Sequence, residues 1–223
     1  MTRALVLANS HKNNGRCVAA IDMKTRQWIR PVGPRPGGEL SLSECAAATD
    51  GGSVEVSFGD VVDLPLGPPR PTSYHPEDIA LAGQMRILGH FTAIEVLAEL
   101  GQQINRSAPL LGIAPDGLSV AAIAERTHHS SLEIAYCDEA KLYWKDRSRW
   151  NRDPQLRGVV NLCGLWEDLA ITDPRLEEQY SGRRGAVTVG PCLTTVSLSE
   201  PFLRGGSDQW CSKVLAALVP LDV

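Results

Sequence analysis

The sequence of 223 residues is poor in aromatic side chains and contains no long apolar run. Phe, Trp and Tyr together make up 5% of the chain, so few rings are present to stack on a ligand. No apolar segment approaches the roughly 18–20 residues that a membrane-spanning helix needs, and the start lacks the charged and then apolar pattern of a signal peptide. We therefore expect a cytoplasmic protein with no membrane partner.

The common catalytic and metal-binding motifs are also missing. The six cysteines form no Cys-x-x-Cys pair, and no Walker loop, nucleophile elbow or His-Glu-x-x-His motif occurs. His128, His129 and Cys137 lie close together in the sequence, and they fit either a metal site or surface histidines beside a buried thiol. We expect reduced thiols, no metal and no cofactor.

The distribution of charge is more informative than its total. A formal net charge of −4 argues against indiscriminate binding to polyanions. Residues 1–38 carry seven cations and one acid, whereas residues 39–138 carry fourteen acids and four cations. A second basic run follows at residues 141–157, and it comprises Lys141, Lys145, Arg147, Arg149, Arg152 and Arg157. Two basic patches separated by acid are typical of a confined nucleic-acid or nucleotide groove, although two solvated surfaces give the same pattern.

Short apolar runs separated by Gly and Pro predict a chain that is mainly β. The first half is expected to hold a strand at 4–8, a loop at 9–12, and a hairpin of 17–21 with 27–32. A helix is predicted over 91–104, where Thr92 and Glu95 resemble a capping box.

The second half is expected to be built in the same way. It should hold a shorter helix at 119–126, a strand pair of 132–136 with 140–145, and a helical turn that begins at Asp173 and Pro174. Many short strands and few helices favour small barrels over a layered α/β fold.

Polar side chains are concentrated near the start of the chain, between two apolar runs. Asn9, Ser10, His11, Lys12 and Arg16 bring amide, hydroxyl, imidazole and cationic groups together. Core packing does not need so many donors in one place, and donors on a rigid scaffold indicate an anionic or hydrogen-bonding ligand. The alternative is that Asn9 and Ser10 cap a turn and that the cations are solvated.

The pattern Ala-Asn-Ser-x-Lys at 8–12, with Gly-Arg-Cys at 15–17 and Trp-Ile-Arg-Pro-Val at 28–32, resembles the opening of the dual OB-fold domain family of small bacterial proteins. Segments 190–202 and 211–217 also resemble this family, and segments 72–75 and 169–174 do so more weakly. The resemblance implies a nucleic-acid-binding role and two OB-type barrels. We place an N-terminal OB-like barrel at 1–90, a helical connection at 91–126 and a C-terminal OB-like barrel at 127–223.

OB-type barrels hold single strands with cations for phosphates and rings for bases. Trp28, Tyr74 and Trp150 are the expected rings, with core packing as the alternative for each of them. Lys213 either reaches the same groove or forms an ion pair that closes a barrel. The predicted binding residues are Asn9, Ser10, His11, Lys12, Arg16, Trp28, Arg30, Tyr74, Lys145, Arg147, Arg149, Trp150 and Lys213.

We therefore expect RNA, single-stranded DNA or a nucleotide-derived end to bind in a groove between two barrels. One alternative is an enzyme that processes nucleotides or nucleic acid in the same groove, with His11, Asp173 or Glu200 as base or Cys17 as nucleophile. A second is a protein–protein adaptor that uses the acidic middle segment. The sequence favours binding over catalysis and does not identify a protein partner.

Overall fold

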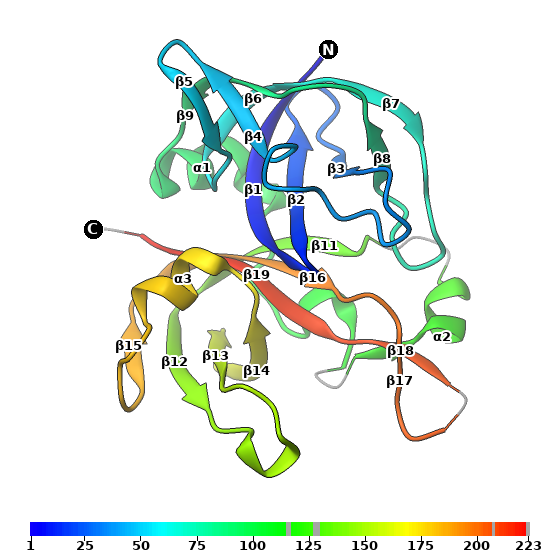
Figure 1. Ribbon diagram of the computed structural model, residues 1–223. Coiled ribbons are helices and arrows are strands. Elements are labelled where there is room, and N and C mark those ends of the chain that lie inside the picture. Colours follow the sequence, from blue (N-terminus) through cyan, green and yellow to red (C-terminus); the bar gives the residue numbers. More distant parts are fainter. Residues whose placement is uncertain (115–116, 127–129, 207, 222–223) are drawn as a thin grey trace.

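The computed structural model describes residues 1–114, 117–126, 130–206 and 208–221. Two large β-sheets lie one above the other, one built from the start of the chain and the other from its second half (Figure 1). We call the first sheet with its loops, residues 2–90, the N-terminal unit. The second sheet with its loops, residues 130–221, is the C-terminal unit.

The N-terminal unit is a nine-stranded sheet in which β1, its longest strand, lies near the middle. The order across the sheet is β5 (Gly52–Glu55), β4 (Ala46–Thr49), β9 (Arg86–His90), β6 (Asp60–Leu64), β1 (Thr2–Lys12), β2 (Gly15–Asp22), β3 (Trp28–Val32), β8 (Asp78–Leu81) and β7 (Leu66–Pro69). Residues 4–8 of β1 are all buried, as expected for a strand that is covered on both faces.

The C-terminal unit is a seven-stranded sheet that places β19 beside β16 and β14. Its order is β11 (Leu132–Cys137), β16 (Cys192–Leu198), β19 (Lys213–Pro220), β14 (Leu165–Ile171), β13 (Gln155–Leu162), β12 (Glu139–Lys145) and β15 (Val187–Val189). Three short strands form a separate small sheet: β10 (Leu118–Ser119), β18 (Gln209–Cys211) and β17 (Phe202–Leu203).

The helices are short, and two of them begin as predicted. α1 (Ala93–Leu100) has the complete capping box of Thr92 and Glu95, and α3 (Pro174–Gln179) begins after its N-cap Asp173. The remaining helical segments are α2 (Val120–Ala124) and the 3₁₀ turns η1 (Gly101–Gln103), η2 (Leu110–Gly112) and η3 (Ser148–Trp150). In the described part of the chain, no helix is long and apolar enough to cross a membrane.

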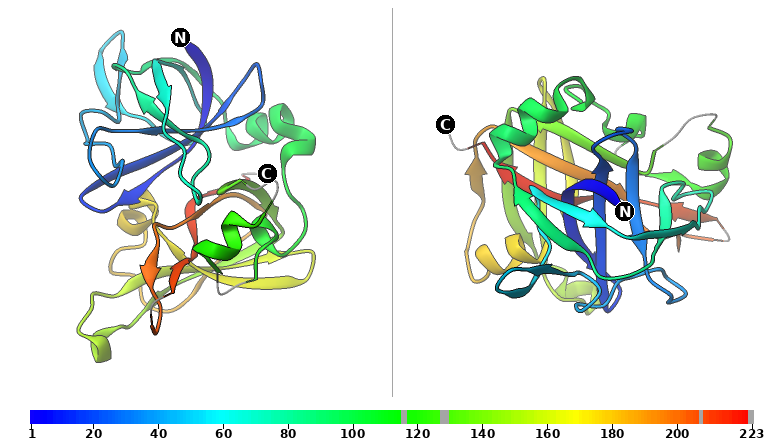
Figure 2. Two further views of the ribbon diagram at one scale, coloured as in Figure 1. Left: turned by 90° about the vertical axis from the view of Figure 1, so that its right-hand side faces the viewer. Right: turned by 90° about the horizontal axis from the view of Figure 1, so that it is seen from above.

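The two units share buried contacts. Leu5 and Leu7 of β1 belong to one apolar cluster with Ile134 and Leu193 of the C-terminal unit. The Thr195 hydroxyl donates to the Leu7 carbonyl at 2.7 Å. The view in Figure 2 shows the N-terminal sheet resting directly on the C-terminal one. The two units are therefore joined by a common apolar core as well as by the polypeptide that connects them.

Three predictions about the strands are wrong. The sheets are not closed barrels: β5 and β7 are edges of one sheet, and β11 and β15 are edges of the other. Segments 132–136 and 140–145 do not pair with each other, because β11 pairs with β16 while β12 pairs with β13 and β15. Residues 9–12 are strand rather than loop, because the turn of the β1–β2 hairpin occurs later, at residues 13–14. The proposed boundaries at 90 and 126 stay predictions.

Candidate functional site

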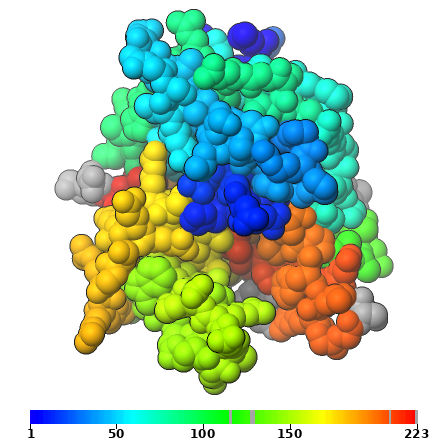
Figure 3. Space-filling model, in the orientation of Figure 1, coloured from blue at the N-terminus to red at the C-terminus, as the bar shows by residue number. Residues whose placement is uncertain are grey.

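A cleft of about 850 Å³ lies where the two units meet. In Figure 3 the surface is hollowed below the dark blue end of β1 and β2, between yellow-green and orange surfaces of the C-terminal unit. The N-terminal unit contributes Ser10, His11, Lys12, Asn13, Cys17, Arg30 and His75 to its lining. The C-terminal unit contributes Arg152, Gln155, Arg157, Asp168, Ser197, Ser199, Glu200, Phe202, Arg204 and others.

The β1–β2 hairpin brings the opening polar block to the cleft. Ser10, His11 and Lys12 line it from the last residues of β1, and Cys17 lines it from β2. Gly15 lets the hairpin lie close to residue 40, since a Cβ at this position would come within 2.3 Å of the Leu40 carbonyl oxygen. The His11 amide donates to the Thr172 carbonyl at 2.7 Å, which fixes the hairpin against the C-terminal unit.

At the floor of the cleft, Arg30 is a cation that is 1% exposed. Its Nη2 donates to the hydroxyls of Ser131 at 2.8 Å and Ser197 at 3.1 Å, both in the C-terminal unit. Its Nη1 lies 3.6 Å from Asp78 Oδ1, and neither Nη1 nor Nε has a hydrogen-bond partner. A buried guanidinium with unused donors is costly for folding, and such a cost makes this place a candidate for binding.

His75 and Asp78 lie beside Arg30 and are also buried. His75 Nε2 lies 3.0 Å from the Leu198 carbonyl oxygen, which can only accept, so this nitrogen carries the proton. Burial, assisted by the charge of Arg30, lowers the pKa of His75 to about 2, so the ring is neutral. Burial also raises the pKa of Asp78 to about 6, although Arg30 opposes that rise.

Lys12 and Glu200 form an ion pair between the buried His75 and the cleft. Lys12 Nζ lies 2.6 Å from Glu200 Oε1, and Glu200 Oε1 lies 3.6 Å from His75 Nδ1. Lys12 is 9% exposed at its side chain and Glu200 is 34% exposed, so Glu200 is the member that faces the open cleft. We call Lys12, Arg30, His75, Asp78 and Glu200 the floor cluster. It joins β1, β3 and the β7–β8 region to the loop that follows β16.

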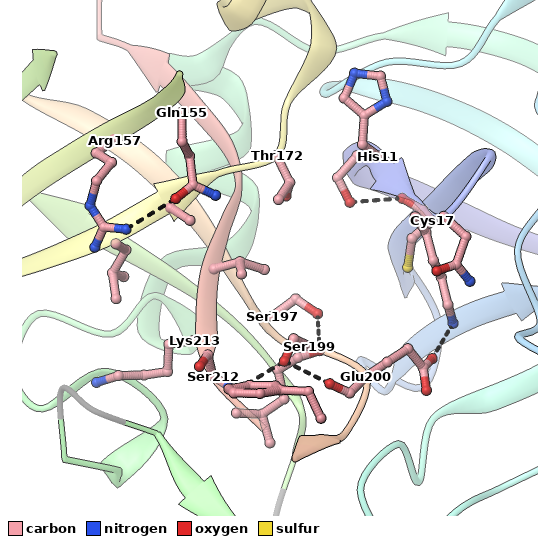
Figure 4. Close-up of a pocket in the computed structure, with 18 of the residues that line it drawn as sticks. His11, Cys17, Gln155, Arg157, Thr172, Ser197, Ser199, Glu200, Ser212 and Lys213 are labelled. Atoms are coloured by element: carbon pink, nitrogen blue, oxygen red, sulfur yellow. Dashed lines mark hydrogen bonds and ion pairs between the residues drawn. The ribbon is translucent and has the colours of Figure 1, made fainter. Parts of the chain in front are cut away.

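The opposite wall comes from β13, whose residues alternate between core and surface. Leu156 and Val160 are buried in the C-terminal core, while Gln155 and Arg157 line the cleft from the other face of the strand. Arg157 Nε pairs with Asp168 Oδ1 at 2.8 Å. Figure 4 shows Gln155 and Arg157 on the side of the cleft opposite His11 and Cys17.

The predicted basic run around Trp150 reaches a second pocket that adjoins the cleft. Lys145, Arg147 and Trp150 line this side pocket together with Arg152 and Gln155, which also line the cleft. Trp150 is 49% exposed, and the Arg149 guanidinium lies 3.7 Å from the centre of its ring. The two basic patches of the sequence therefore meet on one concave surface.

The remaining predicted residues lie elsewhere. Asn9 lines a smaller pocket on another side of β1, and Arg16 forms an ion pair with Glu55 at 2.6 Å. Trp28 packs against two of the apolar clusters. Tyr74 packs against the C-terminal core and meets the His75 ring edge to face. These four side chains are not among those that line the cleft.

Lys213 borders the cleft, but its ammonium group is directed away from it. Nζ donates to the carbonyls of Leu110 at 3.2 Å and Ile113 at 2.8 Å, and it forms an ion pair with Glu167. Figure 4 shows the side chain pointing away from Ser199 and Glu200. Of the two roles considered for Lys213, an ion pair is the one present, and its partner is Glu167.

Of the three suggested metal ligands, Cys137 is the one that lies within the described residues. Cys137 is fully buried beside Cys192 and Thr194, and His128 and His129 lie outside the described residues. Within the described ranges, no three His, Cys, Asp or Glu side chains are grouped so as to hold a metal ion.

Asp78, Ser197, Ser199 and Gln155 are cleft or floor residues that the sequence did not reveal. Ser197 and Ser199 lie inside the second family-like segment, 190–202, whereas Asp78 lies three residues beyond segment 72–75. Position within a motif segment was therefore a usable signal for the two serines only. No sequence motif identified Gln155, because it faces the cleft only through the alternation of side chains between the two faces of β13.

Comparison with known proteins identifies a family for almost the whole chain. No curated protein and no solved structure matches the sequence. Residues 2–218 match the family model described as the dual OB-containing domain. Since this match spans both units and the cleft between them, the chain belongs to the dual OB-containing domain family.

Proposed function

We propose that the protein binds single-stranded nucleic acid, or a nucleotide end derived from it, in the cleft between its two units. The observation that supports this most is the concentration of positive charge in an acidic protein. Five Lys and Arg side chains but only two carboxylates line the cleft, without counting Lys213, whose ammonium group is directed away from it, whereas the chain as a whole has a net charge of −4. A cleft that is basic within an acidic surface favours a polyanion that fits inside it.

The side pocket adds a surface for a base. Trp150 is half exposed, and Arg147 and Arg152 line the same pocket. Single-strand binding sites combine such a ring, on which a base stacks, with cations along the phosphate backbone. The cleft and the side pocket share Arg152 and Gln155, so one strand has a continuous path across both. Duplexes, which are wider and present no unstacked bases, are expected to bind less well.

The direct test is fluorescence polarisation with labelled single strands of about 12 nucleotides, a length within the usual range for OB-type sites. We expect binding that weakens steeply as salt rises, because each phosphate contact releases a counterion. Arg152→Ala should lower the affinity by roughly tenfold, which is the scale for loss of one charge-assisted contact. The Arg152 side chain forms no hydrogen bond or ion pair with the described residues, and its backbone amide keeps its bond to the Arg147 carbonyl in the variant, so the substitution should leave the fold unchanged.

Lys24→Ala is the matched control. Lys24 is an exposed cation in the turn between β2 and β3, and it is not among the cleft residues. The Lys24→Ala variant loses the same charge as Arg152→Ala, but its affinity for the strand should stay within about twofold of the parent's. Equal weakening by both variants would mean that net charge rather than the cleft governs binding. Absence of binding to any single strand at low salt would contradict the proposal.

A further inference from the structure

The floor cluster contains two buried hydrogen-bond acceptors without a hydrogen-bond partner, His75 Nδ1 and Asp78 Oδ1. Because His75 Nε2–H donates to Leu198, the neutral ring turns the lone pair of Nδ1 toward the carboxylates. Glu200 Oε1 lies 3.6 Å from Nδ1 and Asp78 Oδ2 lies 4.0 Å from it. His75 Nδ1 and Asp78 Oδ1 have no hydrogen-bond partner, and both residues are more than nine-tenths buried.

A ligand group that satisfies these acceptors must bring a proton. An ionised phosphate oxygen brings none, and it would also face the carboxylates of Asp78 and Glu200. A hydroxyl group both donates and accepts. The 3.6 Å between His75 Nδ1 and Glu200 Oε1 allows one oxygen to lie about 2.8 Å from both atoms, once a shift of the 34% exposed Glu200 side chain uncovers Nδ1, which is buried in the structure. In that position the same oxygen can accept from Lys12, which already contacts Glu200 Oε1.

The surroundings favour a sugar over a base at this place. Ser10, Ser197 and Ser199 line the same part of the cleft with small hydroxyl side chains. Phe202, the one Phe, Tyr or Trp among the described lining residues, is 43% exposed at the rim, so the floor has no such ring on which a base could stack. The exposed ring of Trp150 lies in the side pocket instead.

We propose that the floor cluster recognises a ribose hydroxyl, so that the cleft binds RNA in preference to DNA. This inference rests on the proposed binding of single strands in the cleft. His75 Nδ1 and Glu200 Oε1 accept the hydroxyl proton, and Lys12 donates to the hydroxyl oxygen. The 2′-hydroxyl is the group that distinguishes RNA from DNA at a single position. Arg30 keeps His75 and Asp78 in place from the buried side.

The test compares three labelled strands of identical base sequence: RNA, DNA, and RNA that is methylated at every 2′ oxygen. The methylated strand keeps the RNA geometry and the acceptor but has lost the proton. We expect RNA to bind about tenfold more tightly than either of the others, the scale for one hydrogen bond to a charged acceptor. Two further base sequences show whether the preference follows the sugar or a particular base.

Glu200→Ala removes one of the two acceptors at the exposed end of the cluster. It should reduce the ratio of RNA affinity to DNA affinity to about twofold or less, and this ratio is the readout because loss of a carboxylate from the cleft raises the affinity for both strands. Glu177→Ala is the matched control, because Glu177 is also a carboxylate, 33% exposed, and its Oε2 lies 3.2 Å from His11 Nε2 rather than in the floor cluster. The control should keep the full RNA preference. Glu200 is exposed enough for its loss to be tolerated, and circular dichroism of both variants confirms folding.

The outcomes of this experiment test recognition of the ribose hydroxyl separately from single-strand binding. Equal binding of RNA and DNA overturns hydroxyl recognition but leaves single-strand binding in place. Equal binding of RNA and methylated RNA shows that backbone geometry is read instead, and it also overturns the inference. A preference that appears with only one base sequence assigns recognition to a base. If no strand binds, the proposed function fails first.

Discussion

Two groups of buried charges border the cleft, and they differ in how completely they are satisfied. Lys213 and Glu167 are almost inaccessible, yet Lys213 Nζ has three partners, and the two Glu167 oxygens accept from Lys213 Nζ and from the Leu110 amide. In the floor cluster, Arg30 Nε and Nη1, His75 Nδ1 and Asp78 Oδ1 have no hydrogen-bond partner, although Arg30 Nη1 lies 3.6 Å from Asp78 Oδ1. Both groups are buried beside the same cleft, so burial alone does not separate them.

This difference in hydrogen bonding indicates that the two groups of buried charges have different roles. A buried ion pair with all its hydrogen bonds made fixes local structure, and here it holds the turn at residues 110–113 against β14 and β19. A buried group with unused donors and acceptors lowers stability until another molecule supplies the missing partners. We therefore interpret Lys213 and Glu167 as structural and the floor cluster as a recognition site.

Breaking the satisfied pair should have the largest effect on stability. Glu167→Gln leaves the Lys213 ammonium buried without its ion-pair partner, so we expect the free energy of unfolding to fall by about 3–5 kcal/mol. Urea denaturation followed by circular dichroism measures this change. The double variant Glu167→Gln with Lys213→Met should recover a large part of the loss, because no charge stays buried. A loss below about 1 kcal/mol in the single variant would contradict the structural role.

Removing the charge of Asp78 should have a smaller effect that depends on pH. The pKa of Asp78 is raised to about 6 in the folded protein from a usual value of 3.8, so the folded state binds this proton more tightly than the unfolded state does. The stability contributed by the protonated form is complete below about pH 4 and is lost as pH rises through about 6. A shift of this size corresponds to roughly 2–3 kcal/mol.

Asp78→Asn has no proton to lose and should not show this change. The difference in unfolding free energy between Asp78→Asn and the parent should therefore move in favour of the variant from pH 4 to pH 6.5 and then stay constant. Urea titrations at four pH values measure it. A constant difference across this range would show that Asp78 has an ordinary pKa and that the floor cluster is not strained.

The smallest effect is expected at the exposed pair on the cleft wall. Asp168 is 41% exposed and pairs with Arg157 on the neighbouring strand. Asp168→Ala should lower the free energy of unfolding by less than about 1 kcal/mol, because water screens both partners. The same urea titration checks this value, and a cost similar to that of Glu167→Gln would remove the distinction between buried and exposed pairs.

Structural features that depend on residues close together in the sequence were predictable. The capping box of Thr92 and Glu95, the N-cap Asp173 and the β2–β3 hairpin all depend on residues a few positions apart, and each is present. The end of β1 was not predictable in this way. Its polar residues 9–12 look like a loop, but they pair with β2 because Lys12 lies opposite Gly15 across a turn at Asn13, whose φ is 50°.

The site was predictable only in part, because it is assembled from distant segments. Lys12 and Arg30 were identified by their motif, yet their partners Glu200 and Ser131 lie more than 100 residues away. No local sequence pattern predicts that Lys213 pairs with Glu167 rather than with a ligand. The sheet pairings that decide this, β14 with β19 in parallel and β16 with β19 antiparallel, depend on long-range packing.

The shared core of the two units has a consequence for how quickly a ligand is bound. Leu5 and Leu7 pack with Leu193, and Ala8 packs with Ala216, so the walls of the cleft belong to one tightly packed body. Such packing resists a swinging motion of one unit against the other. Association should then be a single exponential process whose observed rate rises in proportion to ligand concentration, with no plateau from a slow closing step.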